Sequence, residues 1–109
     1  MNNGSDRSAD NRRLREDLVA LFLSSGVFSL RDEGVEDGFV AGTADPSLDS
    51  LGIDSLSEVE ICVGVEKLWG VSLSPLQLRK LGTLNKLERI VAKSAQARLS
   101  GVRSSASQR

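Results

Sequence analysis

Residues 51–70 read LGIDSLSEVEICVGVEKLWG, and this stretch decides the fold. A short apolar turn containing a glycine delivers Asp54 and Ser55 to a strongly patterned segment that ends before Gly70. The pattern predicts a helix over residues 55–69. Either residue fits the N-cap position, and we favour Asp54, because a serine oxygen that carried an ester would cap poorly. The Ser55 hydroxyl is therefore expected on the surface, where outward N–H groups and the helix dipole favour a phosphate.

The predicted helix carries two apolar lines. Ile61, Val65 and Trp69 recur every four residues, which is the spacing of a core-facing stripe. The second line lies on nearly the opposite side and has a charged border: Leu56, Val59 and Val63, with Glu60, Glu66 and Lys67. One small domain covers both sides of a helix with difficulty, so an exposed partner surface is one interpretation of this line. The alternative is that residues 27–53 fold over it and make it core.

Working outward, the sequence predicts three further helices. The first runs from Asp10 or Asn11 to about Ser24, a short one covers 75–81 after Ser74, and the last covers about 84–99 after Thr83. Residues 27–53 are rich in glycine and acids and are expected to form a long irregular loop. A strand over residues 35–40 is a weaker alternative. The expected fold is an all-α four-helix bundle over residues 11–99, with three long helices and one short, between disordered segments 1–10 and 100–109.

The composition excludes several classes of function. The chain has 109 residues, no histidine and one cysteine, Cys62. Ser-His-Asp and Cys-His catalysis, histidine metal sites and an internal disulfide are therefore excluded, and no metal site is expected. The formal net charge is −1, and no basic face with stacking aromatic residues points to nucleic acid. No apolar run is long enough to cross a membrane or to serve as a secretory signal, so a cytoplasmic protein without membrane insertion is expected.

At this point the residues resemble those of the acyl carrier protein and peptidyl carrier protein superfamily. The resemblance covers about residues 14–97. It consists of the run Leu48-x-x-Leu51-Gly52-x-Asp54-Ser55-Leu56, the pair Val59-Glu60, Glu66, Trp69, Val71-x-Leu73 with Pro75, and Thr83. A bare Asp-Ser-Leu arises often by chance, whereas the whole hexapeptide from Leu51 to Leu56 at the start of a long amphipathic helix is specific. The resemblance implies a helical bundle of the carrier type.

The resemblance also implies a function. Ser55 is similar to the serine to which a phosphopantetheinyl transferase attaches 4′-phosphopantetheine from coenzyme A, and the arm's thiol then holds acyl or aminoacyl groups as thioesters. Asp54 resembles the acid that helps to position the transferase's metal and substrate. Five positions match those through which carriers dock onto basic grooves of enzymes: Leu56, Val59, Glu60, Val63 and Glu66. The chain itself is then no enzyme, and its partners are the transferase, a loading ligase and downstream synthases or transferases.

Some residues depart from fatty-acid carriers. The charge is near neutral, Lys67 stands where many carriers have an acid, and the C-terminal part is basic. These differences favour a specialised pathway, such as polyketide or nonribosomal peptide biosynthesis, over housekeeping fatty acid biosynthesis. The initial Met1 and the lack of an interdomain linker favour a free-standing, monomeric carrier. The alternative function is an unmodified, carrier-like helical module that acts as a scaffold. A Gly-Asp-Ser-Leu hydrolase is disfavoured by the inserted Ile53 and the missing histidine.

Overall fold

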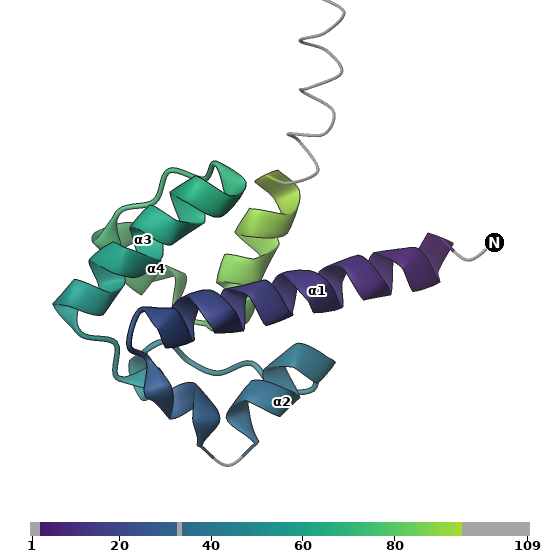
Figure 1. The fold of residues 1–109 in the computed structure, drawn as a ribbon, viewed down its shortest axis with the longest axis horizontal. Coiled ribbons are helices and arrows are strands. Elements are labelled where there is room, and N and C mark those ends of the chain that lie inside the picture. Colours follow the sequence, from purple (N-terminus) through teal and green to yellow (C-terminus); the bar gives the residue numbers. More distant parts are fainter. Residues whose placement is uncertain (1–2, 33, 95–109) are drawn as a thin grey trace, which may run out of the picture.

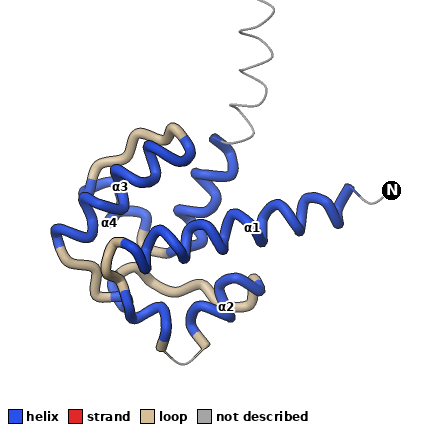
Figure 2. Tube along the Cα trace, viewed as in Figure 1, coloured by secondary structure: helices blue, strands red, loops and turns tan. Residues whose placement is uncertain are grey.

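The computed structural model describes the backbone of residues 3–32 and 34–94, and the side chains from residue 11 onward within those ranges. Its helices are α1 (Asn3–Ser24), α2 (Val35–Ala41), α3 (Ser55–Trp69) and α4 (Pro75–Leu81), with two short 3-10 turns, η1 (Phe28–Arg31) and η2 (Asp49–Leu51). Residues 84–94 are also helical and are called the C-terminal helix below. The described part contains no strand, only an isolated bridge between Ser47 and Thr83, and is all-helical (Figure 2).

The long helix α1 organises the molecule (Figure 1). It packs against α2, η1 and α3, and α4 packs against α3. In the view of Figure 1, α2 lies below α1, whereas α3 lies above its C-terminal half. One side of α3 therefore packs against α1 and α4, whereas its other side faces away from the remaining helices.

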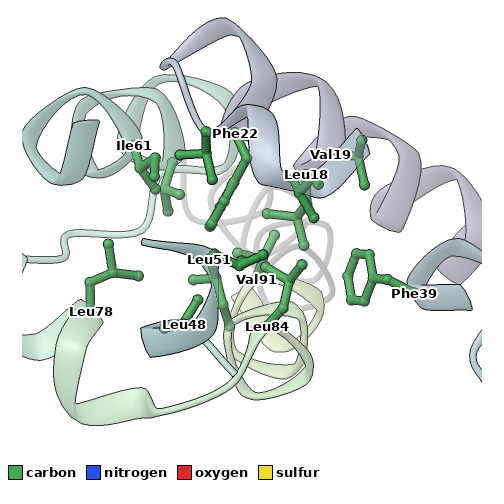
Figure 3. Close-up of a cluster of buried hydrophobic side chains, with 14 of the residues drawn as sticks. Leu18, Val19, Phe22, Phe39, Leu48, Leu51, Ile61, Leu78, Leu84 and Val91 are labelled. Carbon is green, nitrogen blue, oxygen red and sulfur yellow. The ribbon is translucent and has the colours of Figure 1, made fainter. Parts of the chain in front are cut away.

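The core lies where these helices converge (Figure 3). Leu14, Leu18 and Phe22 are buried from α1, and the predicted stripe of α3 is buried at Ile61, Val65 and Trp69. The other elements contribute Phe39 from α2, Leu48 and Leu51 from the turn before α3, Leu78 from α4, and Leu84, Leu87 and Val91 from the C-terminal helix. Burial of this apolar surface is the main stabilising contribution to the fold.

The predicted bounds of α3 and α4 and the predicted start of the last helix are confirmed. Asp54 caps α3, and Gly70, in the left-handed region at φ 71°, ends it. Ser74 and Gln77 form a capping box around Pro75 at the start of α4. The Thr83 hydroxyl accepts a hydrogen bond from the Lys86 N–H at 3.3 Å and caps the C-terminal helix.

Two predictions about the first half were wrong. The first helix begins at Asn3, not at Asp10 or Asn11. No proline interrupts residues 3–24, so the polar N-terminal residues continue the helix. The tail 100–109 and the predicted end of the last helix near residue 99 lie outside the described residues.

The second correction concerns the segment between the first two predicted helices. It is not a plain loop, because it contains α2 and both 3-10 turns, so the described residues form five helices, not four. Residues 35–41 have helical backbone, which rules out the strand alternative. Phe39 and Val40 are buried from this helix, and Gly34 and Gly42 bound it in the left-handed conformation. Phe28, in contrast, is exposed and does not anchor this segment.

A polar cross-link through Arg15 joins α1 to α2 and to the C-terminal helix. The Arg15 side chain donates through Nε to the Val40 carbonyl of α2 at 3.0 Å. Its Nη1 donates to Glu88 of the C-terminal helix, also at 3.0 Å, and both charged side chains are largely buried. Among the described residues no buried side-chain nitrogen or oxygen lacks a hydrogen-bond partner, which is the condition for burying an ion pair at tolerable cost.

Candidate functional site

Ser55 is the first residue of α3 and is exposed. The preceding Asp54 has extended backbone, at φ −85° and ψ 174°, and its Oδ1 accepts a hydrogen bond from the Ser57 N–H at 2.8 Å. Asp54 therefore does the capping, as the sequence predicted. Within the described residues no hydrogen bond occupies the Ser55 hydroxyl, so that its oxygen is available to a reagent in solution.

The turn that delivers Ser55 is anchored on both sides. Leu48 and Leu51 are buried, and Gly52 reverses the chain in the left-handed conformation at φ 64°. The Ser29 hydroxyl donates to the Leu51 carbonyl at 2.7 Å, which ties η2 to η1. The serine is thus held by a turn with both apolar and polar support.

Ser57 fixes the start of α3 against the end of α1. Its Oγ donates to the Ser25 carbonyl at 2.6 Å, and both residues are buried. Sequence reasoning missed this role, because Ser57 fits the local capping-box pattern equally well and its partner is 32 residues away. A buried hydroxyl with a satisfied bond locks the position of the first turn, and therefore of Ser55.

The second apolar line of α3 is exposed. Leu56 is 70% exposed, Val59 48% and Val63 44%. The bordering charged residues Glu60, Glu66 and Lys67 are exposed as well. The alternative in which residues 27–53 cover this line is wrong, because that segment packs mainly against α1. We call the strip of Leu56, Val59, Val63, Glu60 and Glu66 the α3 strip.

A hollow of about 420 Å³ adjoins Ser55 on the side away from the α3 strip, toward α4. Its lining comes from the turn before α3, the first turn of α3, and α4: Leu48, Asp49, Gly52, Ile53, Asp54, Ser55, Glu58, Leu78 and Arg79. Arg79 donates to the Glu58 carboxylate through Nε at 2.8 Å and Nη2 at 3.2 Å. The Glu58 side chain is only 9% exposed, whereas that of Arg79 is 61% exposed. No local sequence pattern predicts this pair, because the two residues come from different helices.

Three ionisable groups near the site depart from their ordinary behaviour. The hydrogen bond from the Ser57 N–H lowers the pKa of Asp54. The hydrogen bonds to Glu58 raise the pKa of Arg79. Burial, with a smaller contribution from the charge of Glu58, raises the pKa of the Cys62 thiol. Cys62 is buried in α3, and its thiol is therefore kept protonated and shielded, as expected of a small core residue rather than of a nucleophile.

No cluster of three or more potential metal ligands occurs among the described residues. None of the described helices combines the length and apolar character that crossing a bilayer requires. Comparisons of the chain with protein-family models, with curated proteins and with solved structures found no match.

Proposed function

We propose that this chain is a carrier protein whose Ser55 bears 4′-phosphopantetheine. In this proposal the helices form a bundle of the carrier type, and the arm's thiol holds acyl or aminoacyl groups as thioesters and presents them to partner enzymes. The attachment forms a bond between the Ser55 oxygen and the phosphorus of coenzyme A's pantetheine phosphate. The pyrophosphate link of coenzyme A breaks, its nucleotide part leaves, and the serine proton passes to the transferase.

The observation that carries the proposal is the division of roles between Asp54 and Ser55. The carboxylate of Asp54 accepts the Ser57 N–H in the first turn of α3, and the adjacent Ser55 is exposed at the helix start. A phosphodiester on that oxygen fits the position, because the positive end of the helix dipole favours an anion and no side chain covers it. The resemblance of residues 48–56 to the attachment motif supports the same conclusion.

The α3 strip supports the interaction side of the proposal. Its apolar residues lie beside the modified serine, with Glu60 and Glu66 at their edge. Such a surface suits brief visits to enzymes with basic grooves, because charge complementarity accelerates encounter more than it tightens binding. A tether at Ser55 then raises the local concentration of the cargo at each active site.

The experiment that tests the proposal is intact-mass measurement after incubation with a broad-specificity phosphopantetheinyl transferase and coenzyme A. The wild-type protein is expected to gain the mass of one phosphopantetheine, and Ser55→Ala to gain none. Ser72→Ala is the matched control, because it removes another exposed serine, from the connection between α3 and α4, and is expected to be modified fully.

Absence of any mass gain in the folded wild-type protein would contradict the proposal and favour the unmodified interaction module. Equal modification of Ser55→Ala would place the attachment elsewhere and contradict it as well.

A further inference from the structure

Ser55 stands on the border between two different surfaces. The α3 strip follows it on one side of the helix, and the hollow opens on the other, where Glu58 lies one turn further along α3. A group attached to the Ser55 oxygen is therefore free to lean over either surface. The direction matters, because a group lying over Leu56 and Val59 would cover the surface proposed for docking.

The charges in the hollow oppose an anion except at one place. Three carboxylates line it, those of Asp49, Asp54 and Glu58. Among the residues that the structure describes, Arg79 is the one cation in this lining. A phosphodiester carries one negative charge, so it is repelled by the carboxylates and attracted by the guanidinium at the distances such a small hollow allows.

The Arg79 guanidinium is oriented for a second partner. Nε and one N–H of Nη2 are engaged by Glu58, which leaves three of the five guanidinium donors without a partner among the described residues. The Glu58 side chain is 9% exposed and that of Arg79 is 61% exposed, so a buried acid holds a solvent-accessible guanidinium that belongs to the lining of the hollow. A fork held in this way loses little side-chain entropy when it binds an oxyanion.

We propose that Arg79, held in place by Glu58, binds the phosphodiester on Ser55 and keeps it on the α4 side of α3. This inference rests on the proposed function and adds a positioning residue to it. The bound phosphate leaves the α3 strip uncovered, and it couples α4 to the modified state of the protein through one charged contact.

The test is a thermodynamic cycle between modification and substitution. The melting temperatures of the unmodified and modified forms are measured for wild type, Arg79→Gln and Lys80→Gln. Lys80 is the matched control, since it is an exposed cation on the same helix that does not line the hollow. Intact mass first establishes that each sample carries the arm, so failure of the proposed function is seen separately.

The change in melting temperature on modification is expected to be about 3 °C more positive in wild type and Lys80→Gln than in Arg79→Gln. If Arg79 only links α3 to α4, Arg79→Gln would lower the melting temperatures of the unmodified and the modified protein equally. The same modification-dependent change in all three proteins would therefore overturn the inference.

A second measurement covers the case in which Arg79→Gln does not fold. The phosphorus NMR resonance of the modified protein is compared between Arg79→Lys, which keeps the charge but loses the fork, and Lys80→Arg. The resonance is expected to move from its wild-type position in Arg79→Lys only. An unmoved resonance in Arg79→Lys, or an equal movement in both variants, would overturn the inference.

Discussion

At the scale of single residues, neighbouring side chains around the start of α3 have sharply different tasks. Asp54 caps, Ser55 is left exposed, Ser57 is buried against Ser25, and Glu58 holds Arg79. The first two tasks follow from local sequence, because capping depends on the three residues that follow. The last two depend on partners in other helices, and no local pattern contains them. The sequence therefore predicts the cap and the exposed serine but not the contacts that hold the first turn of α3 in place.

The cap at Asp54 predicts a specific pH dependence. Folding lowers the pKa of this carboxyl below its ordinary value of 3.8, so the charged form contributes stability that is fully present above pH 3.8 and is lost as the pH falls through the lower folded value. Asp54→Asn keeps a capping oxygen without a titrating group. In urea unfolding from pH 7 to pH 2.5, wild type is expected to lose more stability than Asp54→Asn.

Asp17→Asn serves as the control, because it removes an exposed carboxylate within α1 that caps nothing. If wild type and Asp54→Asn lose the same stability between pH 7 and pH 2.5, this assignment is contradicted. It is contradicted as well if Asp17→Asn differs from wild type as much as Asp54→Asn does.

At the scale of helices, α3 and α4 were predicted with their observed bounds, whereas the first half of the chain was not. Each of these two helices follows a capping side chain, Asp54 or Ser74, and ends at a glycine, Gly70 or Gly82, and α3 has a clear helical period as well. The helix α2 has seven residues, as α4 does, but it contains Gly38 and follows Gly34, which has no side chain to cap it, so local sequence does not separate it from a loop. The wheel of α3 left open whether its second line was covered, since that depends on how residues 27–53 pack.

The exposed α3 strip predicts that docking and stability separate. Val59→Arg adds a positive charge to the α3 strip, which a basic enzyme groove would repel. It is expected to slow modification by the transferase about tenfold, equivalent to roughly 1.4 kcal/mol of activation free energy. Its melting temperature is expected to stay near that of wild type, because the side chain is already half exposed. Modification rates from intact mass and melting by circular dichroism check both parts. Glu66→Arg is expected to behave in the same way.

Leu68→Arg is the matched control: it adds the same charge at an exposed leucine of α3 on the side that faces α1, outside the strip. A collapse of melting in Val59→Arg would assign Val59 to the core, and equal slowing in Leu68→Arg would reduce the effect to net charge. Either result contradicts the docking role.

At the scale of the whole molecule, the Arg15 cross-link holds the C-terminal helix and α2 to α1. Arg15→Met keeps much of the apolar stem but leaves the Glu88 carboxylate and the Val40 carbonyl without this partner. Removing one member of a largely buried pair is expected to cost about 2 kcal/mol in the free energy of unfolding. Urea unfolding followed by circular dichroism measures the loss.

Arg12→Met provides the comparison on the same helix. Its ion pair with Glu16, at 3.6 Å, lies on the exposed face of α1, and its removal is expected to cost less than about 0.5 kcal/mol. Equal losses for the two variants would show that the cross-link adds nothing beyond an ordinary surface pair.

The position of Trp69 gives the molecule an internal optical reporter. It is the one tryptophan of a chain that has no tyrosine, and its indole is buried at the C-terminal end of α3. The rise of a helix, about 1.5 Å per residue, puts it some 20 Å from Ser55. Its emission is expected to shift to the red when the bundle opens, yet to stay unchanged when the arm is attached. One fluorescence trace can thus follow unfolding in apo and loaded protein alike, with neither dye nor label.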